Sequence, residues 1–430
     1  MTAVREPHAL LTDNDAFLAS FDTPPASIAA LRARGHEAFS TLGFPSKRQE
    51  AWRFTSPAPI ARQEFSWARP VETDLDRARV EPFFLDAALE LVFVNGRFAP
   101  HLSDDTSSLG PGVWAGSMAR ALTERPEIVA DHLAQYAPLD EHPFAALNAA
   151  HLADGAFIHV PRGVVVEQAI HLLFVSLPDD GRPVAAYPRN LIVAEENSQV
   201  TVIESYTGYS GDVGFTCPVT EIVGKQASVI DHYKLQQEST AAFHVAVQQV
   251  YLEKSANFFN HHISHGAALA RTDTNAMLDG EGIECTLNGL YLGRGTQHVD
   301  NHMKIDHKMP NCNSYELFKG IMEDRSKAVF DGLIYVWDGA QKTDAKQSNR
   351  NLLLSDAAVV HSNPQLEIFA DDVRCTHGST TGHLEDEALF YLRSRGIGME
   401  AAQSLLTYAF AAEVLAEIRH DQVRKDLEDF

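Results

Sequence analysis

Asn197-Ser198-Gln199-Val200 opens a pattern that the chain repeats, in which a polar and a small residue lead into an apolar run. The other copies are Gln226-Ala227-Ser228-Val229, Ser255-Ala256-Asn257-Phe258 and Arg325-Ser326-Lys327-Ala328-Val329. Their small residues stand at positions 198, 227 and 256, a spacing of 29, and, after two weaker copies, at position 326. A repeat of this length is typical of stacked coils, each of which buries its apolar face only against its neighbours. The pattern therefore predicts a parallel β-helix.

The residues around these copies, from about 155 to 375, support the same architecture. Short runs rich in Val, Ile, Phe, Tyr and Thr alternate with Gly, Asn, Asp and Ser, and no amphipathic helix interrupts them. A solenoid also accounts for the length of 430 residues, because it can grow beyond the ~250–300 residues at which a single core stops growing. A β-sandwich stays open as the alternative, although its seven to nine strands would leave much of this stretch unassigned.

The flanks of this stretch divide the chain into three expected regions. They are a helical and mixed N-terminal region at 1–150, the β-helix core at 151–380 and a helical C-terminal region at 381–430, so the fold class is mainly β. Thr23-Pro24-Pro25 is typical of a helix start and Gly43 of a helix end, and the apolar residues on one face between them are Ile28, Leu31 and Phe39. Trp52, inside the polar stretch 45–55, is expected to anchor that stretch onto the next domain.

Two helices are predicted in the C-terminal region. Glu385-Asp386-Glu387 places acidic groups in the first turn of one helix, where they favour the helix dipole. The second helix begins near residue 400, and its apolar stripe is Leu406, Phe410, Val414 and Ile418. The charged residues that follow, 419–426, are expected to fray. The helical pair either caps the solenoid, whose ends need covering, or forms a docking surface for a partner protein.

Charge and composition exclude several classes of function. The net charge of −23 repels phosphate backbones, so we expect no nucleic acid ligand. No apolar run approaches the ~18 residues of a membrane helix, and nothing resembles a secretory signal, so we expect no membrane partner and a cytoplasmic location. The four cysteines are far apart and read as reduced thiols. The motifs GxxxxGK[ST], GxGxxG, HExxH and GxSxG are missing, which argues against autonomous nucleotide or hydrolase chemistry.

Histidines and cysteines supply the candidate chemistry. Two dense groups stand out, His261-His262-Ile263-Ser264-His265 and the set His298, His302 and His307 with Cys312. Strand alternation puts His298 and His302 on one face and His307 on the other, so we expect a structural or interface role for these groups. Cys375 and His377 are two residues apart and would project from the same side of a strand, where both could bind one ion. Arg374 and a protonated His377 would favour the thiolate form of Cys375.

Five stretches of the sequence are distinctive: 366–378 (LEIFADDVRCTHG), 387–397 (EALFYLRSRGI), 50–55 (EAWRFT), 318–321 (FKGI) and 351–355 (NLLLS). In these stretches the chain resembles the SufB/SufD family of scaffold proteins, which belong to the SUF iron–sulfur cluster assembly machinery. Two positions separate the branches of the family. Asn349 stands where the SufB branch carries its sulfur-accepting cysteine, and Gly378 stands where that branch carries a glutamate. The resemblance therefore favours the SufD branch, with a SufB-like scaffold as the alternative.

The resemblance implies a right-handed parallel β-helix flanked by helical regions and a function as a non-catalytic scaffold. It implies a heterodimer with a SufB-like paralogue, at whose interface Cys375 and His377 lie, with His377 as a transient ligand of the nascent iron–sulfur cluster. It also implies docking of a SufC-like ATPase on the C-terminal helices, with these candidate contacts: Phe390, Tyr391, Arg393 and Arg395. No permanently bound cofactor is expected, and binding of reduced flavin by the complex and a homodimer of the isolated chain stay open.

Two enzymatic alternatives remain. A β-helix polysaccharide lyase or hydrolase would need an exposed acidic cluster along one sheet and usually a secretory signal, and neither is evident. A His-rich metalloenzyme would retain zinc or iron and turn over without partners. Co-purification with a SufB-like chain and an ATPase would decide in favour of the scaffold.

Overall fold

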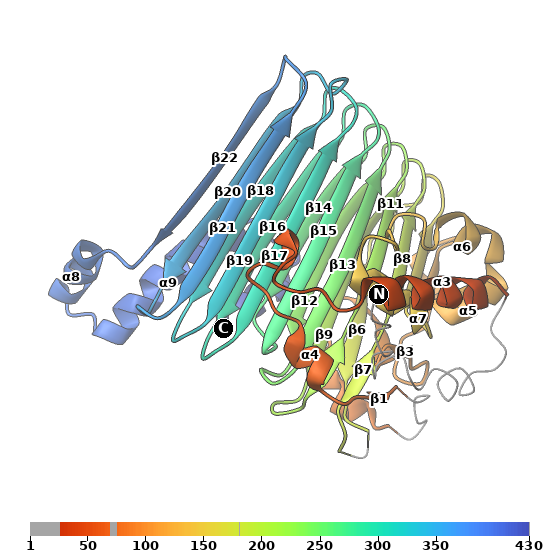
Figure 1. Ribbon diagram of the computed structural model, residues 1–430, viewed down its shortest axis with the longest axis horizontal. Helices are drawn as coiled ribbons and strands as arrows, with labels where there is room; N and C mark the ends of the chain where they lie inside the picture. Colours follow the sequence, from red (N-terminus) through yellow and green to blue (C-terminus); the bar gives the residue numbers. More distant parts are fainter. Residues whose placement is uncertain (1–25, 69–74, 180, 430) are drawn as a thin grey trace, which may run out of the picture.

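The computed structural model describes residues 26–68, 75–179 and 181–429, and its centre is a parallel β-helix flattened into two sheets (Figure 1). The stacked strands of the first sheet are β5 (Ala156–Val160), β8 (Arg189–Ala194), β11 (Val219–Gly224), β13 (Phe243–Leu252), β15 (Leu269–Leu278), β17 (His298–His307), β19 (Lys327–Val336) and β21 (Val359–Ile368). Those of the second sheet are β2 (Leu89–Val94), β6 (Ile170–Ser176), β9 (Gln199–Gly208), β12 (Val229–Gln237), β14 (Asn257–Ser264), β16 (Glu284–Gly293), β18 (Asn313–Met322), β20 (Asp344–Leu353) and β22 (Arg374–Gly382). The predicted fold class is confirmed.

Short strands complete the sheets at the N-terminal end of the solenoid. They are β1 (Ser66–Trp67), β3 (Arg97–Phe98), β4 (Trp114–Ser117), β7 (Val184–Ala186) and β10 (Gly214–Thr216). β2 and β3 form an antiparallel hairpin around Asn95 and Gly96, whose φ angles of 50° and 79° suit a tight turn. β2 also pairs in parallel with β6, so a strand from the N-terminal region extends the second sheet.

The register of the coils differs in detail from the sequence pattern. Val229 pairs with Gln199, so Ser228, and not Ala227, lies level with Ser198. Ala227 instead lies level with Asn197, and both have positive φ angles, 55° and 58°, at the turn before the strand. Ser326 precedes β19, which belongs to the opposite sheet.

The register differs from the sequence pattern because the turns vary in length from coil to coil. A coil spans 27 residues where Asn257 pairs with Glu284 and 31 residues where Asn313 pairs with Asp344. Each turn can absorb a residue while the strands stay aligned, so a constant spacing in the sequence cannot give the register.

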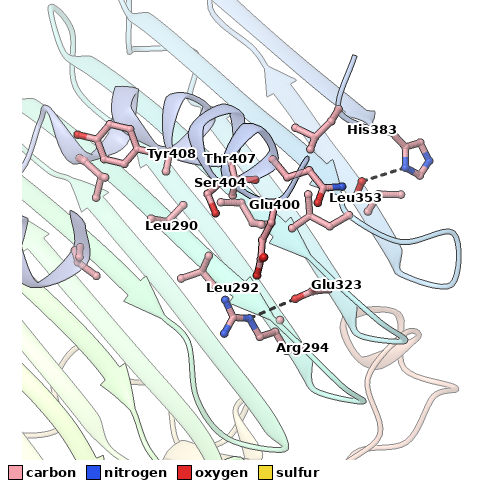
Figure 2. A pocket seen from close by; sticks show the side chains of 18 of the residues that line it. Leu290, Leu292, Arg294, Glu323, Leu353, His383, Glu400, Ser404, Thr407 and Tyr408 are labelled. Carbon is pink, nitrogen blue, oxygen red and sulfur yellow. Dashed lines mark hydrogen bonds and ion pairs between the residues drawn. The ribbon is translucent and has the colours of Figure 1, made fainter. Parts of the chain in front are cut away.

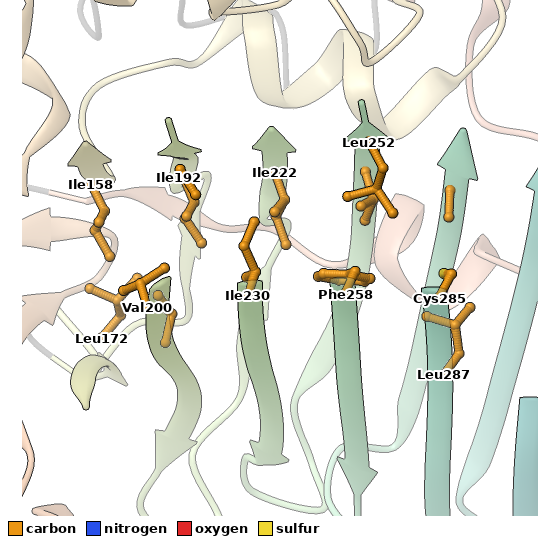
Figure 3. Packing of buried hydrophobic residues seen from close by; sticks show 14 of the residues in the cluster. Ile158, Leu172, Ile192, Val200, Ile222, Ile230, Leu252, Phe258, Cys285 and Leu287 are labelled. Carbon is orange, nitrogen blue, oxygen red and sulfur yellow. The ribbon is translucent and has the colours of Figure 1, made fainter. Parts of the chain in front are cut away.

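The core lies between the two sheets and is built from in-register apolar ladders. Val200, Ile230 and Phe258 follow one another on the second sheet and face Ile192 and Ile222 of the first (Figure 3). These side chains are fully buried. Burial of one such side chain contributes about 1.5–3 kcal/mol, so each coil is stabilised mainly by its two neighbours.

Helices pack on the outer face of the first sheet beside its N-terminal coils. They are α3 (Ala26–Leu42), α4 (Ala58–Arg62), α5 (Met118–Glu124), α6 (Pro126–His132) and α7 (Pro143–Ala150), with short 3₁₀ turns η1 (Glu50–Trp52), η2 (Arg77–Arg79), η3 (Glu81–Phe83) and η4 (Thr106–Leu109). The predicted face of α3 is buried, and Gly43, with φ of 61°, follows its end. α3 packs closely on α7, because a Cβ at Gly35 would lie 2.5 Å from the backbone nitrogen of Ala150. The predicted helix start at Thr23-Pro24-Pro25 lies outside the described residues.

Trp52 anchors the stretch before α4, as predicted. Its ring is 5% exposed, stacks on Phe144 at 5.3 Å and lies 3.8 Å from the guanidinium carbon of Arg271. Arg271 in turn binds the carboxylates of Asp273 and Asp300 at 2.6 Å and 2.8 Å. The buried arginine and its two carboxylates therefore hold this segment against the first sheet.

The C-terminal helices lie on the outer face of the second sheet. α8 (Asp386–Ser394) and α9 (Met399–Leu415) occur where helices are predicted. Val414 and Ile418 pack on outward-facing apolar residues of the second sheet, so the helical pair does not close the end of the solenoid. The expected fraying of 419–426 is wrong, because α10 (Asp421–Asp429) forms there and buries Val423 in the same cluster. Among the described residues, no helix is long and apolar enough to cross a membrane.

Candidate functional site

The C-terminal end of the solenoid is open. In the described part of the chain, β22 pairs only with β20 and β21 pairs only with β19, so each sheet ends in a free edge (Figure 1). Most residues of β22 are exposed, whereas β18 and β20 alternate between buried and exposed positions. Unpaired strand edges carry free N–H and C=O groups and are the usual place for another chain to add a strand. This end is therefore suited to docking a partner.

Cys375 and His377 both lie on β22, two residues apart, as the spacing predicts. Cys375 is half-buried and packs in a cluster with Ala345 and Leu366. His377 is exposed and lies level with Gln347 of β20. The strand thus places a thiol and an imidazole next to each other at the open end.

The thiol is not activated in the way the sequence suggested. Burial raises the pKa of Cys375, and the nearby Asp344 carboxylate raises it further, so the neutral thiol is favoured. The expected stabilisation of the thiolate by Arg374 and His377 is therefore wrong, because the cluster around Cys375 excludes water on one side.

Behind His377 the lumen of the β-helix holds a buried acid. Glu316 of β18 is 3% exposed, and its Oε2 accepts a hydrogen bond of 3.0 Å from the amide of Gln347. Burial raises the pKa of Glu316 to about 8. Sequence reasoning missed Glu316 and the other polar residues of the lumen, although polar residues recur at inward positions of successive coils. The recurrence of these polar residues can be recognised only once the register of the strands is known.

The first histidine group lies in the wall and lumen of the solenoid. His261 stacks on Tyr233 with ring centroids 4.7 Å apart. Burial lowers the pKa of His262 well below its ordinary value and that of His265 to about 4, so both stay neutral. His262 points into the lumen, whereas His261 lies on the outer face of the second sheet beside Tyr233, and both positions agree with a structural role.

The second histidine group is divided between two faces of β17, as strand alternation predicts. His302 lies on the outer face, 3.0 Å from Asp300. Although burial disfavours its charged form, the Asp300 carboxylate raises the pKa of His302. His307 lies on the inner face and bonds Ser314 of the other sheet at 2.9 Å, and burial lowers its pKa to about 4. Within the described ranges, no group of three or more His, Cys, Asp or Glu side chains is placed to hold a metal ion.

The candidate contacts of α8 form an exposed patch. Phe390 is 72% exposed and Tyr391 is 57% exposed. The guanidinium of Arg395 lies 5.1 Å from the centre of the Tyr391 ring and donates a hydrogen bond of 3.2 Å to its hydroxyl. Arg393, in the last turn of α8, is also exposed. Large exposed aromatic side chains next to arginines are typical of protein interfaces.

A groove of 720 Å³ separates the first part of α9 from the second sheet. Figure 2 shows Leu290 and Leu292 on its floor, Tyr408 on the helix side and an ion pair of 3.5 Å between Arg294 and Glu323 at its rim. The later part of α9 is anchored, because Lys319 of β18 binds Glu413 at 2.7 Å. α8 and the start of α9 therefore extend outward from a fixed base.

Comparisons with known proteins cover nearly the whole chain. The family described as "SUF system FeS cluster assembly, SufBD core domain" matches residues 176–410, and that described as "SufBD protein N-terminal region" matches residues 9–172. An iron–sulfur cluster assembly SufBD family protein of Synechocystis is 34% identical over 388 residues, which span 88% of this chain and 84% of that protein. The iron–sulfur cluster assembly protein SufD of Escherichia coli is 32% identical over 387 residues, spanning 90% of this chain and 88% of that protein.

Proposed function

The chain belongs to the SufBD family of the SUF iron–sulfur cluster assembly system, and we propose that it is the SufD-type scaffold subunit of that system. Its role lies in iron–sulfur cluster assembly. The subunit has no catalytic activity of its own, acts in the cytoplasm and holds part of the pocket in which the cluster is built. The observation that carries this proposal is an exposed imidazole on the free edge strand of an open solenoid.

The partner at the open end is a SufB-like paralogue. A chain with the same β-helix has matching strand edges, which could meet β21 and β22. Ile368 and Phe369, at the end of β21, are 38% and 59% exposed and would supply apolar area to such an interface. The isolated chain could use the same edges to form a homodimer.

His377 supplies one ligand to the nascent cluster, which is the cargo of the complex. A neutral imidazole is a good ligand for iron, and His377 is accessible from the side where the partner docks. The paralogue supplies the thiolate and carboxylate ligands. Cys375 is auxiliary, because its raised pKa keeps it a neutral thiol. Reduced flavin, if the complex uses it, is bound by the assembled complex.

The SufC-like ATPase docks on the C-terminal helices. This surface is separate from the open end, and its exposed aromatic rings and arginines are arranged for contact with another protein. The nucleotide chemistry then belongs to the ATPase, in agreement with the missing phosphate-binding motif in this chain.

Replacement of His377 by Ala tests the proposal. The chain is co-expressed with the SufB-like paralogue and the ATPase, and iron and sulfide are measured anaerobically in the reconstituted complex. We expect His377→Ala to leave the complex intact and to lower the cluster yield. The matched control is His383→Ala, because His383 is also exposed and lies just beyond β22, where its ring bonds the backbone oxygen of Leu353 at 3.0 Å. An unchanged yield for His377→Ala would remove the assignment.

A further inference from the structure

A chain of side-chain hydrogen bonds crosses the lumen just behind the open end. Ser379 of β22 donates to the hydroxyl of Ser362 on β21 at 2.8 Å. Ser362 donates to Oδ1 of Asn349 on β20, also at 2.8 Å. The last strand of one sheet is thereby tied to the last strand of the other and to the coil behind them.

The side chain of Asn349 is the centre of this network. Its Oδ1 also accepts a hydrogen bond of 2.7 Å from Asn351. Its Nδ2 donates to the hydroxyl of Tyr291 at 3.0 Å and to the backbone oxygen of Phe318 at 3.3 Å. Asn349 is fully buried, and two donors and two acceptors are as many as its amide offers. A fully satisfied buried amide has one orientation, so it is a rigid support for what it binds.

The network reaches two strands back into the solenoid because of a glycine. Tyr291 lies on β16, and its hydroxyl donates to Oδ1 of Asn351 on β20 at 2.5 Å, across Gly320 of the intervening strand β18. A Cβ at Gly320 would lie 2.2 Å from the Tyr291 ring and 2.6 Å from Oδ1 of Asn351. The glycine leaves the space through which the tyrosine reaches the last coil.

The inner face of the last strand is otherwise held by the packing of Cys375 and by a hydrogen bond of 3.4 Å from Nδ2 of Asn351 to the backbone oxygen of Thr380. Ser379 lies on the same face of β22 as His377, two residues further along, and β22 has a ladder of backbone hydrogen bonds on one edge only. A hydroxyl bond that holds Ser379 to the opposite sheet therefore limits the twist of β22 and the direction in which the neighbouring side chains project.

We propose that Asn349, Ser362 and Ser379 form a positioning network that holds β22 in place and so sets the direction of the His377 imidazole. This inference rests on the proposed role of His377. It adds that this chain orients the His377 imidazole before the partner protein binds. None of the three residues is a ligand or a catalytic residue.

Substitutions at Ser362 test the network in the full-length chain. Ser362→Ala removes both hydroxyl bonds, whereas Ser362→Thr keeps the hydroxyl. Asn363→Ala is the matched control, because Asn363 is the next residue of β21 and bonds Asp331 on the outer face at 2.9 Å. Hydrogen exchange of the β22 peptide and the alkylation rate of Cys375, the one cysteine that is not buried, report the mobility of the strand. Loss of a typical hydrogen bond predicts roughly fivefold faster exchange and alkylation in Ser362→Ala, with Ser362→Thr and Asn363→Ala close to the unmodified chain.

Equal exchange and alkylation in Ser362→Ala and the unmodified chain would overturn the network. Cluster yield in the reconstituted complex tests its purpose, and we expect Ser362→Ala to lower the yield and Ser362→Thr to restore it. If Ser362→Ala speeds hydrogen exchange in β22 but leaves the cluster yield unchanged, the positioning role would be overturned. If His377→Ala itself keeps full yield, the assignment of His377 fails, and the exchange data alone then decide whether the network holds the strand.

Discussion

The titration of Glu316 gives a test of the lumen that needs no partner protein. Burial raises the pKa of this carboxyl from an ordinary 4.5 to about 8, so the folded chain keeps the proton between these values while the unfolded chain releases it. Where the folded state binds more protons, stability falls as pH rises, by about 1.4 kcal/mol per pH unit for one group. The contribution of Glu316 is therefore fully favourable below pH 4.5 and is lost progressively up to pH 8.

The substitution Glu316→Gln removes this dependence, because the amide is neutral at all pH values and has nearly the same shape. Between pH 5.5 and 7.5, we expect the free energy of unfolding of the variant to rise relative to the unmodified chain by up to ~3 kcal/mol. Other titrating groups, including the thiol of Cys285 beside Glu316 and the buried histidines, are present in both chains and cancel in the difference.

Urea unfolding at three pH values, followed by circular dichroism of the β-sheet, measures this difference. The control is Glu323→Gln, because Glu323 lies just beyond the same strand and is exposed beside Arg294. A difference between Glu316→Gln and the unmodified chain that stays constant with pH would show that Glu316 is ionised in the folded state, and the reasoning on the lumen would then be wrong.

Three further outcomes are expected. Arg271→Met should lower the free energy of unfolding by about 3–5 kcal/mol in thermal or urea unfolding, because two buried carboxylates lose their partner; a loss below 1 kcal/mol would contradict this. Gly320→Ala should cost about 1–3 kcal/mol through its clash with Tyr291, whereas Gly378→Ala, which has open space around its Cβ position, should cost less, and equal losses would refute the packing argument. Phe390→Ala should weaken co-purification of the ATPase roughly tenfold or more without affecting pairing with the SufB-like chain, and unchanged recovery of the ATPase would remove Phe390 from the docking surface.

The architecture could be predicted because it depends on local patterns. Alternation along a strand assigns His302 and His307 to opposite faces of β17, and both lie where the alternation puts them. The helices at the two ends follow from apolar stripes and end signals within each segment. Cys375 and His377 also lie two residues apart on a single strand, as their spacing predicts.

The two wrong predictions, on the stretch 419–426 and on the Cys375 thiolate, have a common physical cause. The charged stretch 419–426 was expected to fray because its own sequence offers little to bury, but Val423 reaches an apolar surface made by distant strands. The Cys375 thiolate was expected from the charges next to it in sequence, but burial against other coils raises the pKa of the thiol, and the Asp344 carboxylate raises it further. In both cases the deciding neighbours are tens to hundreds of residues away.

The amino-acid sequence by itself determined that this chain is a stack of β-coils with helical ends, because strand alternation, turns and helix stripes are properties of adjacent residues. Only the tertiary structure decided which residues meet between coils, because turns of different length change the register from one coil to the next. The neutral acid Glu316 and the bonds that join Asn349, Ser362 and Ser379 exist only in that register.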